Sequence, residues 1–181
     1  MRFLKEETAL VVIDVQERLF PHIYENDFLK KNLEILIKGF QALEVPTLFT
    51  EQYVKGLGPT LNFIKDLFVW EFKTIEKMAF SCVDELSFVQ ELGSLNKKNI
   101  ILAGIETHVC VLQTALDLKA QSYNVMVVED CVSSRKNSDK QSALKRMQQE
   151  GILITSYESI LLELCRVSGT DTFKTISKLI K

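Results

Sequence analysis

Clusters of basic residues are absent from this chain of 181 residues. Its 22 Lys and Arg are outnumbered by 24 Asp and Glu, which gives a formal net charge of −2. The sequence has no run of Lys or Arg and no basic stripe interleaved with aromatic residues. A protein without such a surface has no general attraction for phosphate backbones. We therefore expect no nucleic-acid partner.

Histidine and paired cysteine are also scarce. The only histidines are His22 and His108. No C-x-x-C pair occurs among the four cysteines, which are Cys82, Cys110, Cys131 and Cys165. A structural zinc site needs Cys or His ligands at short spacings, so we expect no zinc and interpret the cysteines as reduced thiols.

Long hydrophobic runs are missing too. No stretch approaches the roughly 18 apolar residues of a membrane span, and the N-terminus lacks an apolar signal segment with a cleavage site. We expect no membrane partner and a cytoplasmic location, with an organelle matrix left open. Without a linker, repeat or low-complexity segment, residues 1–181 read as one domain. A content of 46% apolar and 25% charged residues is typical of a globular protein.

Short apolar runs alternate with helical patterns along the chain. Unbroken apolar runs of this kind are typical of strands buried on both faces. They lie at residues 9–13, 47–49, 100–103, 125–128 and 152–154, and a weaker strand is expected near 72–75. The alternation predicts an α/β fold with a doubly wound, mainly parallel six-stranded sheet and helices on both faces, as in Rossmann-like domains.

Helix boundaries are marked by polar residues. Residues 29–40 and 83–92 have the period of one-faced helices, and residues 173–180 suggest a terminal helix. Ser81-x-x-Asp84 and Thr155-x-x-Glu158 have the pattern of capping boxes. Asn137 or Ser138 is a candidate cap for the helix that contains Met147.

Cys110 closes the run of residues 104–110, which joins an apolar strand pattern, residues 99–103, to an apolar-periodic stretch, residues 109–118. A thiol at the start of a helix meets unpaired backbone N–H groups and the positive end of the helix dipole. Both favour the thiolate and therefore nucleophilicity. The alternative from placement alone is a cysteine that packs as a small hydrophobic residue.

Two further reactive residues follow strands of the expected sheet. Asp14 ends the first strand, and Lys77 follows the weak one. In such sheets ligands bind beyond the carboxyl ends of the strands, so both should meet Cys110 in one crevice. The carboxylate can take the thiol proton while the ammonium stabilises negative charge. Asp14 could instead be a helix cap, and Lys73 is a competing lysine.

These residues resemble the isochorismatase-like cysteine hydrolases, which include nicotinamidases and carbamoylsarcosine amidases. The resemblance rests on residues 12–16 (VIDVQ), 77–81 (KMAFS) and 104–111 (GIETHVCV) and covers nearly the whole chain. Residues 50–59 (TEQYVKGLGP) and 130–135 (DCVSSR) look like the branch of isochorismatase domain-containing proteins. The isochorismatase-like hydrolase fold is therefore implied.

The resemblance also implies roles. Cys110 would be the nucleophile that forms a thioester, Asp14 the general base and later acid, and Lys77 the charge stabiliser. A cis peptide bond would join Ile105 to Glu106. The backbone N–H groups of Glu106 and Cys110 would form the oxyanion hole. Family members are homo-oligomers, so a dimer or a larger assembly is implied.

Two departures narrow the chemistry. Nicotinamidases hold zinc through an Asp-x-His element and a later His, where this chain reads Glu51-Gln52-Tyr53. No metal and no cofactor are therefore expected. True isochorismatases cleave a vinyl ether without depending on a cysteine, so the presence of Cys110 points to acyl chemistry.

We expect a metal-independent cysteine hydrolase acting on a small amide or related carbonyl substrate. The alternatives are a silent scaffold for protein-protein contact and a vinyl-ether hydrolase. Residues 51–60 are interpreted as a mobile lip over the crevice. The candidate substrate-pocket residues are Phe20, Gln52, Tyr53, Phe80 and Ser81, and Trp70 is a further candidate for the pocket wall. Cys82 is expected to pack in the core, with a place in the pocket wall as the alternative.

Overall fold

The computed structural model describes residues 1–69 and 72–181, so Trp70 lies outside the described residues. Its centre is a six-stranded sheet in the order β3-β2-β1-β4-β5-β6. Every strand pair of this sheet is parallel. The strands are β1 (Thr8–Ile13), β2 (Thr47–Gln52), β3 (Ile75–Lys77), β4 (Asn99–Ile105), β5 (Asn124–Ser133) and β6 (Leu153–Thr155).

Strand order reverses beside β1. The chain first runs outward from β1 to β2 and β3, and then returns to place β4 on the other side of β1. Ile13 pairs with Thr50 of β2 and with Gly104 of β4. The ends of β1, β2 and β4 therefore meet at one edge, which is where a doubly wound sheet binds ligands.

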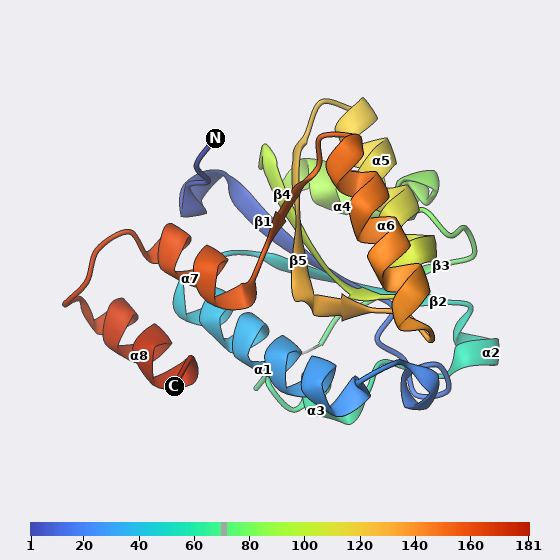
Figure 1. The fold of residues 1–181 in the computed structure, drawn as a ribbon, viewed down its shortest axis with the longest axis horizontal. Coiled ribbons are helices and arrows are strands. Elements are labelled where there is room, and N and C mark those ends of the chain that lie inside the picture. The colour runs from blue at the N-terminus through green and yellow to red at the C-terminus, as the bar shows by residue number, and fades with distance from the viewer. Residues whose placement is uncertain (70–71) are drawn as a thin grey trace.

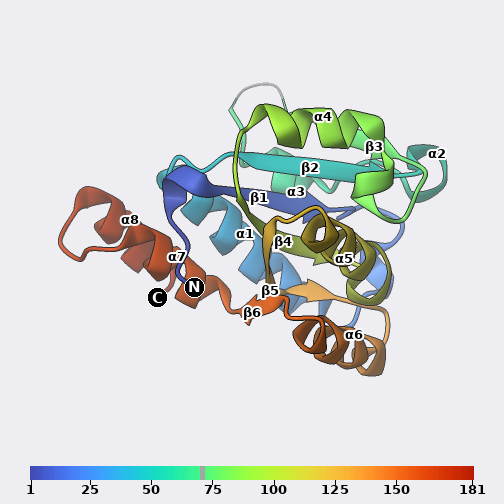
Figure 2. The same ribbon diagram turned by 90° about the horizontal axis from the view of Figure 1, so that it is seen from above.

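Helices cover both faces of the sheet, as Figure 2 shows from above. One face carries α1 (Asn26–Ala42), α7 (Tyr157–Cys165) and α8 (Asp171–Leu179), with the short α3 (Asn62–Lys65) beside α1 (Figure 1). The opposite face carries α4 (Leu86–Ser94), α5 (Leu112–Ala120) and α6 (Asn137–Gln149). The predicted doubly wound α/β fold is confirmed.

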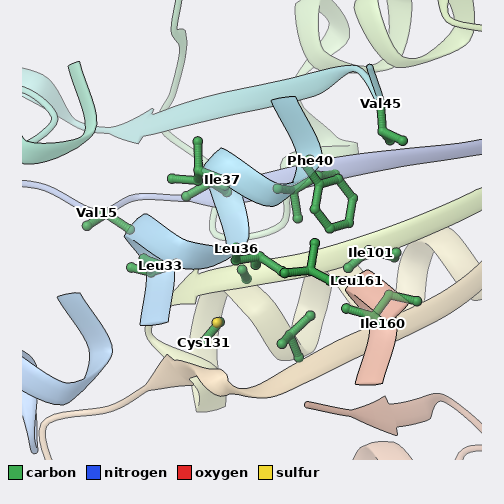
Figure 3. Close-up of a cluster of buried hydrophobic side chains, with 14 of the residues drawn as sticks. Val15, Leu33, Leu36, Ile37, Phe40, Val45, Ile101, Cys131, Ile160 and Leu161 are labelled. Carbon is green, nitrogen blue, oxygen red and sulfur yellow. The ribbon is translucent and has the colours of Figure 1, made fainter. Parts of the chain in front are cut away.

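Each face has its own hydrophobic core, because successive side chains of a strand point to opposite faces. Leu10 and Val12 pack with the α1 side, whereas Ala9, Val11 and Ile13 pack with the α4–α6 side. From α1, the buried side chains recur every three or four residues, and Figure 3 labels four of them in the cluster that also holds Ile101 and Leu161: Leu33, Leu36, Ile37 and Phe40. Burial of each such side chain stabilises the fold by about 1.5–3 kcal/mol.

Several expected boundaries differ from the structure. The weak strand covers Ile75–Lys77, so Lys77 is its last residue and does not follow it. Phe72, where this strand was expected to begin, packs its ring 4.8 Å from that of Phe49. Phe72 therefore packs against the hydrophobic core on the α1 face of the sheet and is not part of a strand.

The helix caps also differ in part. Ser156, and not Thr155, caps α7, because its hydroxyl accepts a hydrogen bond from the Ser159 N–H. Neither Asn137 nor Ser138 caps α6, which begins at Asn137 after Lys136. Ser81 does act as a cap, but of the short 3-10 turn η3 (Cys82–Asp84) that precedes α4.

Short irregular turns complete the fold. They are the 3-10 turns η1 (Lys5–Glu7) and η2 (Phe20–His22), the single turn α2 (Val54–Leu57) and the π-helical turn η4 (Thr107–Val111). Cys110 lies in this π-helical turn, so the regular helix begins after it, at Leu112. Within the part of the chain that the structure describes, no helix is long and apolar enough to cross a membrane.

Candidate active site

A buried ion pair lies at the carboxyl edge of the sheet. Lys77 Nζ is 2.7 Å from Asp14 Oδ2, and the two side chains are 0% and 1% exposed. Asp14 directly follows β1 and has a positive φ of 52°, which turns the chain out of the strand. The Thr50 hydroxyl donates to Asp14 Oδ1 at 2.7 Å, so both carboxylate oxygens have a donor.

Lys77 has further acceptors around its ammonium. Gln52 Oε1 lies at 2.7 Å, and the carbonyl oxygens of Ala79 and Phe80 each lie at 3.2 Å. Burial disfavours the charged amine, but Asp14 favours it, and the net effect raises the pKa of Lys77. The lysine is therefore a fixed cation at neutral pH.

Cys110 lies near this ion pair and comes from the segment after β4, on the other side of β1 from β2 and β3. Its Sγ atom lies 3.9 Å from Gln52 Oε1, and the residue is 6% exposed. The π-helical turn that carries it follows β4, the neighbour of β1 in the sheet. The three residues expected to share a crevice are thus brought to one place.

The electrostatic state of Cys110 differs from the expectation of a ready thiolate. Burial and the nearby Asp14 carboxylate raise the pKa of this thiol far above its usual range, and the opposing effect of Lys77 is smaller. Desolvation disfavours the charged form of any buried thiol. At neutral pH the resting sulfur is therefore protonated, and the position near the start of a helix does not override its burial.

A cavity of about 210 Å³ opens at this edge. Its wall contains both Asp14 and Cys110, and the remaining lining residues are Leu19, Gln52, Leu57, Phe80, Glu106, Val109 and Arg135. Gln52 and Phe80, two of the expected pocket residues, therefore line it.

Three other expected pocket residues lie elsewhere. Phe20 is buried in the core, with its ring 5.7 Å from Phe63. Ser81 is also buried and caps η3, while Tyr53 is 44% exposed. Cys82 is fully buried and is absent from the cavity lining, so the packing interpretation fits it. The expected lip forms the turn α2, whose last residue, Leu57, contributes to the cavity wall.

The loop after β4 contains a cis peptide bond between Ile105 and Glu106, as expected. The Glu106 carboxylate accepts hydrogen bonds from the Arg135 backbone N–H at 2.9 Å and from Arg135 Nε at 3.2 Å. These bonds join the loop before Cys110 to the loop after β5. Both residues line the cavity, so this contact forms one of its walls.

Sequence reasoning missed Arg135 and Thr50 as parts of the site. Arg135 ends the 130–135 stretch that supported the resemblance, so a signal for it was present. Thr50 likewise begins the 50–59 stretch that supported the resemblance, but nothing in that stretch points to Asp14. Its contact with Asp14 follows from the register that pairs it with Ile13, and only the folded sheet provides that information.

No group of three or more His, Cys, Asp or Glu that could hold a metal occurs among residues 1–69 and 72–181. The ionisable groups that the structure gathers at or beside the cavity are the Asp14–Lys77 ion pair, the neutral Cys110 thiol and the contact between the Glu106 carboxylate and the Arg135 guanidinium.

Residues 8–159 match the model of the isochorismatase domain. The chain belongs to the isochorismatase family. A mouse member, isochorismatase domain-containing protein 2A, is 38% identical over 99% of this chain and 85% of its own length. The resemblance recognised in the sequence is thus confirmed, including the branch.

Solved structures of the isochorismatase family agree. A chain described as MAR1 ribonuclease from Caenorhabditis elegans superimposes with a TM-score of 0.92 at 37% identity, over 99% of this chain and 92% of that one. The YcaC gene product of Escherichia coli, described as an octameric hydrolase of unknown specificity, gives a TM-score of 0.93 at 27% identity. That alignment covers 99% of this chain and 89% of YcaC.

Proposed function

We propose that this protein is a metal-independent cysteine hydrolase that cleaves a small amide or a related carbonyl compound through a thioester. The observation that carries the proposal is the shared cavity of Cys110 and Asp14, with Lys77 held against Asp14 at 2.7 Å. A nucleophile, a base and a fixed cation are the groups that acyl transfer requires.

In the proposed first half-reaction, Asp14 takes the proton from Cys110 Sγ as the sulfur attacks the substrate carbonyl carbon. The carbonyl oxygen gains negative charge and is held by the backbone N–H groups of Glu106 and Cys110. Each such donor contributes roughly 3–4 kcal/mol in well-studied enzymes. Collapse breaks the C–N bond, and Asp14 returns its proton to the leaving amine.

The second half-reaction removes the acyl group. Asp14, again a carboxylate, takes a proton from water while the water oxygen attacks the thioester carbon. The C–S bond breaks, the sulfur recovers a proton from Asp14, and a carboxylic acid leaves. Lys77 enters each half-reaction charged, because the Asp14 carboxylate and the other charges around it raise its pKa by more than burial lowers it.

The size of the cavity supports a small substrate. Pockets for drug-sized ligands measure roughly 300–1,000 Å³, and this one holds about 210 Å³. Its lining combines polar groups, including Asp14 and Cys110, with the apolar side chains of Leu19, Leu57 and Val109.

The ribonuclease description of the Caenorhabditis elegans chain raises a second possibility for the substrate. RNA binding depends on several cations along the strand. Among the described residues that line this cavity, Arg135 is the one cation, and its Nε already hydrogen-bonds Glu106. The site therefore favours a small neutral or singly charged substrate over a nucleic acid.

Assembly is part of the proposal. The Escherichia coli relative is described as octameric, and we propose that this chain also forms a homo-oligomer. Light scattering on the purified protein measures the number of subunits, and a monomer at all concentrations would contradict this part.

The deciding experiment follows ammonia release from a panel of small primary amides, with wild type and Cys110→Ala compared. We expect at least one amide to be hydrolysed by wild type and no turnover by Cys110→Ala. Hydrolysis of a vinyl ether that survives Cys110→Ala would favour the alternative reaction. An inactive wild type that binds a protein partner would favour the scaffold, and RNA cleavage that survives the variant would also overturn the proposal.

A further inference from the structure

Gln52 lies between Lys77 and Cys110 but has no role in the proposed hydrolysis. It ends β2, and its backbone is fixed from both sides by one side chain. Gln16 Oε1 accepts from the Gln52 N–H at 2.7 Å, and Gln16 Nε2 donates to the Gln52 carbonyl at 3.0 Å. Gln16 itself is fully buried. These bonds fix the Gln52 backbone, and its side chain extends toward Lys77.

Chemistry also fixes which way the Gln52 amide is turned. One end lies 2.7 Å from Lys77 Nζ and the other 2.7 Å from the Met78 carbonyl oxygen. An ammonium can only donate and a carbonyl can only accept. The oxygen must therefore face Lys77 and the NH₂ group must face Met78, because the reverse orientation would leave donor against donor and acceptor against acceptor.

The Gln52 oxygen consequently competes for the protons of Lys77. The ammonium has three N–H groups, and the structure gives it four acceptors, which are Asp14 Oδ2, Gln52 Oε1 and the carbonyls of Ala79 and Phe80. A thiolate at Cys110 would therefore find the ammonium already occupied. The same Gln52 oxygen lies 3.9 Å from Cys110 Sγ, where it accepts from a thiol and repels a thiolate.

We propose that Gln52 is a positioning residue that keeps Cys110 a neutral thiol in the resting protein and keeps the Lys77 ammonium turned toward Asp14. The inference rests on the proposed function in one respect, namely that Cys110 is the nucleophile. As a consequence, the Cys110 thiol reacts slowly with electrophiles other than the substrate. Asp14 deprotonates it only when a substrate carbonyl group is in place to receive the sulfur.

Other charged groups face the same sulfur and must be held constant in a test. Asp14 comes from the end of β1, Lys77 from β3 and the Cys82 thiol from η3. Glu106 and Arg135 line the cavity from the loops after β4 and β5. Substitutions at Gln52 leave all of these in the chain, so a change in thiol ionisation can be assigned to the Gln52 amide.

The experiment measures iodoacetamide alkylation of Cys110 against pH by peptide mass spectrometry, which needs no substrate. Gln52→Met keeps a long unbranched side chain but removes the amide oxygen, so a Cys110 thiolate loses a repelling neighbour at 3.9 Å and competes with one acceptor fewer for the Lys77 ammonium. We expect the midpoint of alkylation to move to lower pH and the rate at pH 8 to rise about tenfold, the effect of one pKa unit. Gln52→Glu adds negative charge and should move the midpoint to higher pH.

If Gln52 positions these groups, the alkylation midpoints of the two variants shift in opposite directions. If Gln52 has only a structural role, neither midpoint shifts or both shift in the same direction. Phe80→Leu alters the same cavity without changing a polar group and serves as the control for access to the sulfur. An unchanged or higher midpoint in Gln52→Met overturns the inference. Should Gln52→Met fail to fold by circular dichroism, Gln52→Glu decides alone, and a midpoint that does not rise overturns it.

The test is independent of the substrate search. If no amide is hydrolysed but the two midpoints shift in opposite directions, the proposed function fails and the role of Gln52 in thiol ionisation stands. If amides are hydrolysed but the two alkylation midpoints do not shift in opposite directions, the proposed function stands and the role of Gln52 in thiol ionisation fails.

Discussion

Lys77 Nζ lies 2.7 Å from Asp14 Oδ2 across 63 residues of sequence, and neither side chain is more than 1% exposed. Each charge is tolerated in the interior because the other compensates it. Removal of one partner from a buried pair typically costs 3–5 kcal/mol, whereas removal of both can be nearly neutral.

This relationship predicts strong coupling between the two residues. Lys77→Met should lower the free energy of unfolding by about 3–5 kcal/mol, because it leaves the Asp14 carboxylate buried and uncompensated. Asp14→Asn should also destabilise the protein, because it leaves the ammonium unpaired. The double variant should recover most of the loss and remain inactive. Urea unfolding of the four proteins gives the coupling energy, and strictly additive losses would contradict the prediction.

A second prediction concerns alkaline pH. Burial, followed by the Asp14 carboxylate, raises the pKa of the Cys82 thiol from 9.0 to about 11. Below pH 9 both the folded and the unfolded states keep this proton, so the contribution to stability is complete. Between about pH 9 and 11 the unfolded state loses the proton first, so the free energy of unfolding falls as pH rises.

Cys82→Ala removes this thiol, so the decline in stability above pH 9 should become shallower by up to about 1.4 kcal/mol per pH unit. The matched control is Cys165→Ala, at the partly exposed end of α7, where the thiol meets water in both states. Urea unfolding from pH 8 to 11 measures both slopes. Equal slopes in Cys82→Ala and wild type would show that the Cys82 proton does not matter for stability.

The third prediction concerns the close approach of β4 to β1. Gly104 has a φ of +111°, and a Cβ atom at this position would overlap the backbone oxygen of Ile13. Gly104→Ala should therefore destabilise the protein by about 3 kcal/mol or more, since both the backbone conformation and the strand spacing must change.

Gly93 provides the control for this substitution. It lies exposed in α4, and a Cβ atom there meets nothing within 4 Å. Gly93→Ala should stabilise the protein by about 0.5–1 kcal/mol through its higher helix propensity. Thermal unfolding compares the two variants, and a Gly104→Ala protein as stable as wild type would be inconsistent with the strand spacing described here.

The local sequence was sufficient to place the larger elements. Apolar runs such as residues 9–13 and 100–103 are long enough to identify buried strands, and the spacing of Leu29, Leu33, Leu36 and Phe40 identifies α1. Short elements were harder, because a three-residue strand such as β3 has no period of its own. Its position is set by pairing Glu51 with Glu76 and Gln52 with Lys77.

The sequence by itself determined the alternation of strands and helices, the family, and Asp14, Lys77 and Cys110 as the residues that the crevice should unite. The strands and helices follow from the local hydrophobic pattern, and the family and the three residues follow from short sequence motifs. Tertiary structure alone decided that Thr50 and Gln52 would contact them, that Phe20 and Ser81 would be buried away from the cavity, and that Cys110 would rest as a neutral thiol. Hydrogen bonding across strands and the loss of water around a side chain depend on residues far apart in the chain, so no local pattern encodes them.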